Sequence, residues 1–272
     1  MLSSWIIHFS FDPVALQLGP IAIRWYGLCW MLAFLQANYL AGRMLARLGR
    51  RDIDVSGLTV AALFGTIVGA RLAHCLFYDP AFYLSHPLKI FALWEGGMAS
   101  HGGAVGFLFA IAWAAKKYAK GLPLLTLLDV VSLPASFGGA IVRIANFLNS
   151  EILGLPTSGE WGVVFYRVDQ LPRIPIQLFE AIAYGLVGIF LYWQYYRRNS
   201  LSHPGRLMGW FFVLVFGFRA ILEPWKMPQA AYEVGDVVSV GQWLSVPFIL
   251  IGIFFVWKSR GVSRLTDQST PV

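Results

Sequence analysis

The sequence predicts an all-α, polytopic integral membrane protein with seven transmembrane helices. Composition, apolar segment length and the placement of basic residues indicate this fold class. Hydrophobic residues make up 57% of the 272 residues and charged residues only 13%, with a mean hydropathy of +0.62. A soluble domain has about 25% charged residues. Half that charge cannot cover a soluble particle of 30.3 kDa, which excludes an ordinary soluble enzyme, a disordered chain and a collagen-like fibre.

Seven apolar windows are long enough to cross a bilayer, which takes roughly 20 residues each. Residues 79–96 are too interrupted by Pro and charge to cross, so we expect an interfacial segment there. Residues 150–175 form an outer loop, and the absence of a linker or repeat predicts one domain over 1–272. The predicted spans lie near 21–41, 57–78, 98–117, 124–148, 176–196, 205–222 and 237–257.

Lys and Arg orient these spans, because cytoplasmic loops carry an excess of basic residues. Thirteen lie on the side that holds the C-terminus and five on the other, while three more fall within spans or at their edges. The sequence therefore predicts a cytoplasmic C-terminus and an N-terminus outside. The net charge of +7 is explained by this bias, and no nucleic-acid partner is expected.

The N-terminal segment and the cysteines add little chemistry. MLSSWIIHFSFDP has no basic stretch and no convincing cleavage site, so we do not expect a removable signal peptide. Cys29 and Cys75 lie in apolar runs without ligand spacing, which favours two buried, unpaired residues over a disulfide or a zinc site. No metal and no cofactor are expected.

Pairs of glycines predict where helices approach closely. Gly65 and Gly69, like Gly102 and Gly106, are four residues apart, the spacing at which small residues let two membrane helices touch. Weaker signals of the same kind are Gly138–Gly139 and Gly185 with Gly188.

Polar and ionisable residues within spans are costly, so each needs a partner or a purpose. With the predicted orientation, polar groups from six spans fall at one depth, near the outer leaflet. The inner ends carry mainly Lys and Arg that extend to the surface. The residues at the outer depth are Arg24, Tyr26, Arg71, His101, Arg143, Asn146, Asn149, Glu151, Glu180, Arg219 and Glu223.

The spacing of these residues suggests a phosphate site. Arg143 and Asn146 share a helix face, and Arg219 can pair with Glu223 four residues on. A guanidinium group binds phosphate through two parallel N–H···O hydrogen bonds, and an anionic phospholipid headgroup is the phosphate available at that depth. Structural alternatives stay open: Arg219–Glu223 as a plain ion pair, His101 as a packing residue, and Arg71 as a residue that only pairs with a carbonyl or carboxylate.

Seven ordered motifs resemble those of the prolipoprotein diacylglyceryl transferases over nearly the whole chain. The His-Gly-Gly block and the block that begins at Arg143 are the most specific. The motifs are RWYGL (24–28), ARLAHCLFYDP (70–80), EGGMASHGG (95–103), RIANFLNSEILG (143–154), PRIPIQLFEA (172–181), FRAILE (218–223) and GQWLSVP (241–247).

The resemblance implies a bacterial inner-membrane enzyme with its active site toward the outer leaflet. It would move the sn-1,2-diacylglyceryl group of phosphatidylglycerol onto the lipobox cysteine thiol of a prolipoprotein signal peptide and release glycerol phosphate. The motifs imply catalytic roles for His101, Arg143, Arg219 and Glu223. They imply substrate binding by Tyr26, Asn146, Glu151, Gly154, Gly102, Gly103, Gln177 and Glu180.

Four positions depart from the family pattern. Ile174 replaces the usual His and Phe179 the usual Tyr, while Ala220 stands for Phe and Lys226 for a frequent Arg. These changes leave the expected central residues in place, but they question a proton-transfer role for residues 172–181.

In the expected mechanism, His101 takes the proton of the thiol, and Arg143 and Arg219 stabilise the departing phosphate. Glu223 would hold Arg219. Residues 79–96 and the outer loop form either a lid or a static surface. The rival function is a phospholipid or anion transporter that uses the same arginines. The sequence shows no inverted repeat for a transporter, no cytoplasmic partner surface for a receptor and no HxxxxD motif for an acyltransferase.

Overall fold

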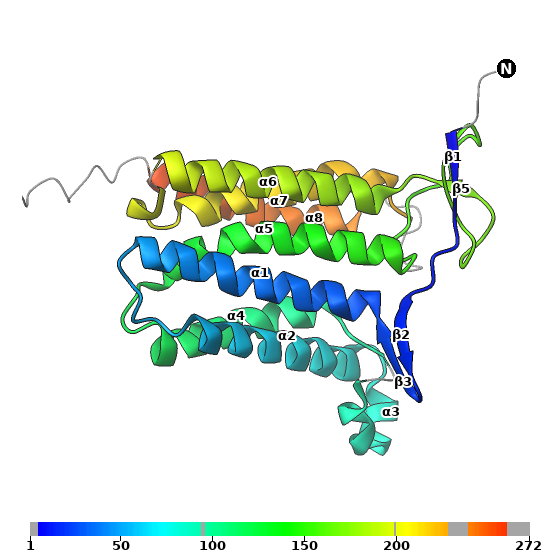
Figure 1. Ribbon diagram of the computed structural model, residues 1–272, viewed down its shortest axis with the longest axis horizontal. Helices are drawn as coiled ribbons and strands as arrows, with labels where there is room; N and C mark the ends of the chain where they lie inside the picture. The colour runs from blue at the N-terminus through cyan, green and yellow to red at the C-terminus, as the bar shows by residue number, and fades with distance from the viewer. Residues whose placement is uncertain (1–4, 94–95, 199, 228–238, 260–272) are drawn as a thin grey trace, which may run out of the picture. The chain divides into compact units, whose positions relative to one another are not determined.

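The computed structural model describes residues 5–93, 96–198, 200–227 and 239–259 (Figure 1). The chain divides into two compact units. The first contains residues 1–37 and 128–272, and the second contains residues 38–127.

Every predicted span coincides with a long α-helix within the described residues. Five of these helices are long and apolar enough to cross a membrane: α2, α5, α6, α7 extended through Trp225, and α8. Residues 237–238 of the last predicted span lie outside the described part of the chain. The long helices are α1 (Trp25–Arg47), α2 (Val55–Phe77), α4 (Ser100–Tyr118), α5 (Leu124–Leu148), α6 (Ile176–Arg198), α7 (Arg206–Leu222) and α8 (Val240–Lys258).

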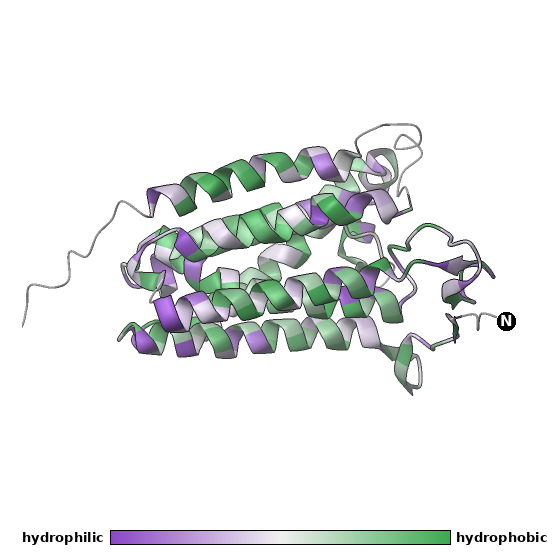
Figure 2. Ribbon diagram, turned by 90° about the horizontal axis from the view of Figure 1, so that it is seen from above, coloured by the Kyte–Doolittle hydropathy of each residue, from purple (hydrophilic) through white to green (hydrophobic). Residues whose placement is uncertain are grey.

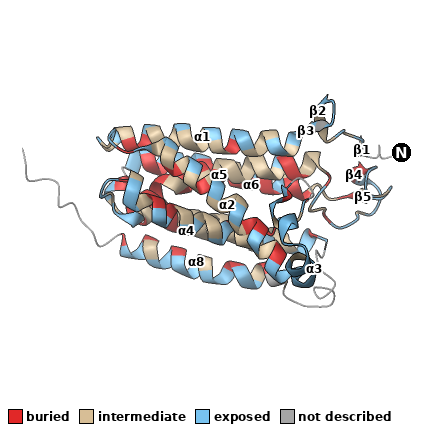
Figure 3. Cartoon of the chain, turned by 90° about the horizontal axis from the view of Figure 1, so that it is seen from below, coloured by how far each residue is buried: buried red, intermediate tan, exposed pale blue. Residues whose placement is uncertain are grey.

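The long helices consist mainly of hydrophobic residues, as expected of helices that face lipid (Figure 2). Large hydrophobic side chains are exposed along them, including Phe64, Ile189, Leu250 and Trp257. Figure 3 shows exposed residues along the length of α8. A soluble monomer rarely exposes so much contiguous apolar surface. The chain is therefore a mostly helical membrane protein.

The first predicted span starts too early. Residues 21–24 form strand β3 (Ile21–Arg24), which pairs antiparallel with β2 (Val14–Leu18). The turn at Gly19, where φ is +58°, reverses the chain between the strands. The apolar residues at the start of the predicted span thus form hairpin hydrogen bonds instead of helix, and α1 begins only at Trp25.

The predicted outer loop contains two strands of a small sheet that the sequence analysis missed. Strand β4 (Trp161–Phe165) lies between β1 (Trp5–Phe9), to which it is parallel, and β5 (Pro172–Arg173), to which it is antiparallel. The rings of Phe9, Phe147 and Phe165 pack together, and Phe165 is fully buried. These rings join the sheet to the C-terminal end of α5.

In the second unit, α2 and α4 touch backbone to backbone. A Cβ on Gly69 would lie 2.3 Å from the Gly102 carbonyl oxygen, and one on Gly106 would lie 2.1 Å from that of Gly65. The prediction of close packing at these four glycines is confirmed. The first unit has a similar contact that was not predicted, since a Cβ on Gly209 in α7 would lie 2.9 Å from the Gly252 oxygen in α8.

The interfacial segment forms two short helices, α3 (Pro80–Ser85) and η1 (Pro87–Phe91). Residues 94–95 of it lie outside the described residues. The buried guanidinium of Arg71 in α2 organises the remainder, and its N–H groups donate to five backbone carbonyls. The acceptors are Lys89, Ile90, Ala92, Gly96 and Gly97. Arg71 thus holds the connection that leads into α4, the structural alternative left open for this residue.

Asp129 in α5 caps the N-terminus of α7, which has no side-chain cap of its own. The carboxylate is fully buried and accepts hydrogen bonds from Gly205 N at 2.6 Å and Met208 N at 2.8 Å. These N–H groups belong to the first turn of a helix, where they lack intrahelical acceptors. The cap therefore joins α5 to the N-terminus of α7.

We expect Asp129→Ala to lower the free energy of unfolding by about 2 kcal/mol, because two buried N–H groups lose their acceptor. Asp129→Asn keeps one acceptor oxygen and should lose less. Thermal unfolding of the purified protein in detergent micelles measures both. An alanine variant as stable as the parent would show that the cap contributes nothing.

Candidate active site

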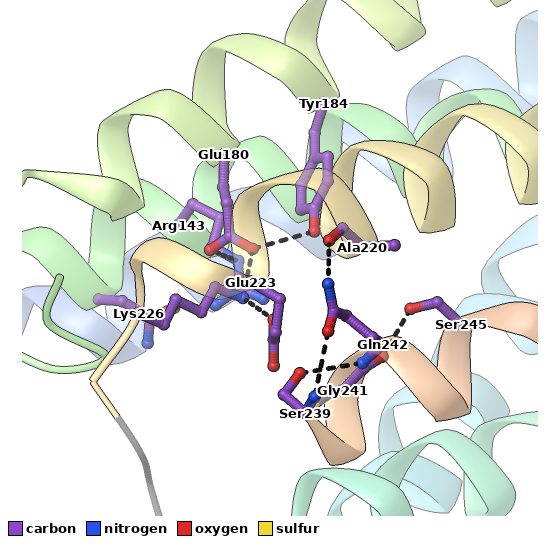
Figure 4. A network of polar contacts seen from close by, with 11 residues as sticks. Arg143, Glu180, Tyr184, Ala220, Glu223, Lys226, Ser239, Gly241, Gln242 and Ser245 are labelled. Carbon is purple, nitrogen blue, oxygen red and sulfur yellow. Dashed lines mark hydrogen bonds and ion pairs between the residues drawn. The ribbon is translucent and has the colours of Figure 1, made fainter. Parts of the chain in front are cut away.

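Four helix ends of the first unit meet in a network of charged and polar side chains (Figure 4). They are the C-terminal ends of α5 and α7 and the N-terminal ends of α6 and α8. Successive helices run in opposite directions, so these ends lie on one side of the unit. Within this unit, the predicted convergence of polar residues is confirmed.

Glu180 in the first turns of α6 is the centre of the network. Its side chain is 0% exposed. One carboxylate oxygen lies 3.1 Å from Arg143 Nε, and the other lies 2.8 Å from Lys226 Nζ. The Tyr184 hydroxyl, one turn further along α6, donates to Glu180 Oε1 at 3.4 Å. A buried carboxylate is stable only with such partners, and here it holds a guanidinium and an ammonium in place.

Lys226 is a member of the site that the sequence analysis counted only as a loop cation. Its ammonium also lies 2.7 Å from Glu223 Oε2, so it bridges two carboxylates while it is itself buried. The short helix η4 (Glu223–Trp225) makes this possible, because its turn, closed by the hydrogen bond from Lys226 N to the Glu223 carbonyl, brings Lys226 back toward Glu223. The sequence shows that Lys226 replaces a frequent Arg, but it does not show that Lys226 pairs with Glu180 and Glu223.

The predicted ion pair between Arg219 and Glu223 is wrong. Glu223 binds Lys226 instead, since η4 turns the chain directly after α7. Among the described residues, Arg219 makes no ion pair and no side-chain hydrogen bond. It lies on the last turn of α7 and interacts electrostatically with Tyr184. Its guanidinium is therefore available for an anion.

The ion-paired groups, together with Arg219, contain one more cation than carboxylates. Two carboxylates, Glu180 and Glu223, form ion pairs with two cations, Arg143 and Lys226. Arg219 is a third cation, near Tyr184, whose hydroxyl donates to Glu180. The first two cations are held by the carboxylates, and the third has no described partner. Such an arrangement is suited to an anion, because two of the cations are already held in position, and guanidinium is the group best matched to phosphate oxygens.

The N-terminus of α8 makes room for Glu223. A Cβ on Gly241 would lie 1.9 Å from Glu223 Oε1, so only glycine fits there without moving the carboxylate. Ser239 caps this helix through a capping box with Gln242, and Gln242 Nε2 also donates to the Ala220 carbonyl at 3.2 Å. The partial positive charge at the start of a helix favours the neighbouring carboxylate. Gly241 and Gln242 belong to a motif quoted above, but neither was assigned a role.

Gly241→Ala should therefore displace the Glu223 carboxylate and lower the activity of the site about tenfold or more. Gly217→Ala on α7 is the matched control, because a Cβ there meets nothing within 4 Å. Initial rates of product formation compare the two variants. Equal rates in both would show that the fit between Gly241 and Glu223 does not matter.

The predicted lipid-binding residues after Arg143 form a connected chain. Arg143 Nη1 donates to Asn146 Oδ1 at 3.4 Å, and Asn146 Nδ2 donates to Glu151 Oε2 at 3.4 Å. Glu151 also accepts from Asn149 at 2.5 Å, while its backbone oxygen accepts from Gln177 Nε2 at 2.7 Å. The predicted face shared by Arg143 and Asn146 is confirmed. Glu151 reaches Arg143 only through Asn146.

Gly154 lies where two segments cross closely. Its backbone pairs with Lys226 in an antiparallel bridge, and a Cβ would lie 2.3 Å from the Ile174 carbonyl oxygen. Arg173 donates to the Gly154 carbonyl at 3.2 Å and pairs with Asp169, which lowers the pKa of that carboxyl. Gly154 thus helps to place Lys226. Ile174 takes part through its backbone, which any residue there would supply.

The remaining predicted residues lie elsewhere in the two units. Tyr26 is half-buried on the first turn of α1 and makes no side-chain hydrogen bond with the described residues. His101, Gly102 and Gly103 begin α4 in the second unit. His101 is exposed and lines a cavity there, whereas Gly102 and Gly103 pack against α2. That His101 acts together with the arginines stays a prediction.

The donor set of the described residues contains no group of three His, Cys, Asp or Glu side chains that could hold a metal ion. Both cysteines are free thiols, with Cys75 buried and Cys29 half-buried. The expected burial is confirmed for Cys75 only.

Comparison with known proteins finds one family along the chain. The family model for prolipoprotein diacylglyceryl transferase matches residues 13–258. The phosphatidylglycerol–prolipoprotein diacylglyceryl transferase of Tolumonas auensis is 46% identical over 254 residues, which is 93% of this chain and 98% of the relative. The protein of that name from Chloroherpeton thalassium is 40% identical over 99% of this chain and 100% of its own length. The similarity inferred from the motifs is confirmed.

Proposed function

The chain belongs to the prolipoprotein diacylglyceryl transferase family, and from this premise we propose its substrates, chemistry and site. It is a transferase that acts in lipoprotein diacylglyceryl transfer. The donor is phosphatidylglycerol, and the acceptor is the lipobox cysteine thiol in the signal peptide of a prolipoprotein. The product is a thioether, and glycerol phosphate leaves.

One observation carries this proposal: the guanidinium of Arg219 has no ion-pair partner among the described residues. A phosphodiester headgroup supplies the anion that the arrangement of Arg219, Arg143 and Lys226 lacks. During transfer the leaving phosphate gains a second negative charge, which a fixed cation stabilises more than it stabilises the starting lipid. Glu180 and Glu223 keep the other two cations in position, so little rearrangement is needed.

The step exchanges one bond for another. The bond between carbon 3 of the diacylglycerol and its phosphate oxygen breaks, and its electron pair stays on the phosphate. The cysteine sulfur forms a bond to the same carbon. The thiol proton goes to the imidazole of His101, because a thiol with a pKa near 8.5 is a weak nucleophile until it is deprotonated. Arg219 belongs to the first unit and His101 to the second. The role of each is therefore proposed independently of the other.

Further residues bind the two substrates in this scheme. Asn146 donates to an oxygen of the phosphate or glycerol, and Tyr26 contacts the lipid headgroup. Glu151 and Gln177 hold the start of the outer loop, which meets the incoming peptide. Gly154 supports that loop beside Lys226. The connected hydrogen bonds from Arg143 to Gln177 support this assignment.

We place the enzyme in the bacterial inner membrane, with seven spans in a single domain, the N-terminus outside and the site toward the outer leaflet. Helices α1 and α4 supply the two spans beyond the five apolar ones. Exposed Leu35 on α1 and Phe109 on α4 support a lipid-facing position for both helices. The excess of basic residues on the side of the C-terminus supports the orientation.

Purified protein tests the function directly when it is mixed with phosphatidylglycerol and a lipobox peptide. We expect a thioether-linked peptide and one equivalent of glycerol phosphate, and neither with a peptide in which Ser replaces the cysteine. Movement of lipid or anion across a vesicle without these products would favour the transporter alternative, which the comparisons do not favour.

A further inference from the structure

A cavity of about 940 Å³ lies along the seam between α2 and α4 in the second unit. Its walls are apolar side chains of both helices, among them Val68, Leu72 and Leu76 from α2 and Val105 and Phe109 from α4. His101 lines it at the N-terminal end of α4. Of the side chains that line this cavity, the mechanism proposed above uses only His101.

The glycine seam explains why the cavity exists. Gly65, Gly69, Gly102 and Gly106 all line it, and they let the two helices touch without side chains between them. The larger side chains on either side stand above this floor as walls. Phe109 is 75% exposed and Val68 is 50% exposed. The walls are therefore open to an apolar guest from the surroundings of the helices.

The dimensions match one leaflet of a bilayer. The cavity follows α2 from Gly65 to Phe77, twelve residue steps or about 18 Å at the rise of an α-helix. The hydrocarbon core of a bilayer is about 30 Å thick, so one lipid tail covers about half of it. Helix α2 is itself long and apolar enough to cross a membrane, so hydrocarbon surrounds this groove.

The charge of the lining matches a neutral hydrocarbon chain. None of the lining residues is Asp, Glu, Lys or Arg. The one ionisable group apart from a tyrosine is His101, and it stands at the end where α2 finishes and α4 begins. A guest that fits is apolar along its length and polar at one end, as an acyl chain with its glycerol is.

We propose that this groove binds an acyl chain of the donor phosphatidylglycerol, with the glycerol end beside His101. The proposal rests on the proposed function, since it concerns the lipid that the enzyme consumes. The groove would fix the position of the glycerol carbon 3 relative to the imidazole. It would also make affinity depend on chain length, because each methylene that enters the groove gains van der Waals contacts with a fitted apolar wall.

Two valines on α2 provide a matched test. Val68 lines the groove and is 50% exposed, whereas Val60 lies two turns away, does not line it and is 52% exposed. Val68→Trp fills the groove, and Val60→Trp adds the same bulk outside it. Val105→Trp fills the groove from α4 and serves as a second variant if Val68→Trp does not fold.

The first measurement needs no catalysis. Phosphatidylglycerol with a photoreactive group in one acyl chain is incorporated with the protein into nanodiscs, and the labelled peptides are mapped by mass spectrometry. We expect labelling along the groove that excess phosphatidylglycerol reduces and phosphatidylcholine does not. Labelling should fall about tenfold in Val68→Trp and stay at the parental level in Val60→Trp.

The second measurement is the dependence of KM on the lipid. Val68→Trp should raise KM for phosphatidylglycerol with long acyl chains about tenfold, with less change for short chains and little change in kcat. Equal labelling of both valine variants, or phosphatidylcholine competing as well as phosphatidylglycerol, would overturn the proposal. So would a raised KM for the peptide instead of the lipid. Groove labelling without any transfer would refute the proposed function and leave the lipid groove standing.

Discussion

Arg219→Ala should reduce kcat/KM at least about a hundredfold, because the leaving phosphate loses the one cation of the site that has no described partner. Arg219→Lys keeps the charge but not the two parallel N–H donors, and should recover only part of the rate. Release of glycerol phosphate from phosphatidylglycerol, measured against lipid concentration, gives both constants. Since Arg219 has no described ion-pair partner, the free energy of unfolding should hardly change.

This combination of outcomes separates a phosphate ligand from a structural arginine. Arg167→Ala is a suitable control, since that arginine is exposed and its side chain makes a single hydrogen bond with the described residues, to the Asn149 carbonyl at 3.4 Å. It should leave both rate and stability near the parental values. If Arg219→Ala unfolds at a lower temperature and keeps its rate, Arg219 is structural and the phosphate-binding role is refuted.

Glu180→Ala should destabilise the protein by about 3–5 kcal/mol, the largest effect on stability that we expect. The fully buried carboxylate holds Arg143 and Lys226 together, and its removal leaves two cations in a poorly solvated place without their shared partner. Activity should be lost as well, because Arg143 is no longer held. Thermal unfolding in detergent micelles and initial rates measure the two consequences.

A second substitution tests whether unpaired charge is the cause. Glu180→Gln combined with Lys226→Met removes one carboxylate and one cation together, so it should be more stable than either single variant. If the double variant shows the sum of the two single effects, Glu180 and Lys226 do not interact energetically. The loss of stability in Glu180→Ala would then have another cause.

The positions of the helices could be predicted from residue order alone. Apolar windows predicted where each long helix lies, because the cost of burying polar groups in lipid constrains every residue of a span. The four glycines of the α2–α4 seam were also predicted correctly, since their spacing depends only on helix geometry. The short strands β1 to β5 were missed, because they are held by pairing between distant segments, such as Trp5 with Trp161.

The polar pattern predicted which residues gather but not how they pair. A spacing of four residues suggested Arg219 with Glu223, and this rule considers one helix only. In the folded protein Glu223 binds Lys226, which comes from the turn after α7, while Glu180 arrives from another helix. Partner choice among nearby charges follows from distances in space, and these depend on where η4 turns and how α6 packs. For this reason the available guanidinium of Arg219, the fit of Gly241 against Glu223 and the groove beside His101 emerged only from the tertiary structure.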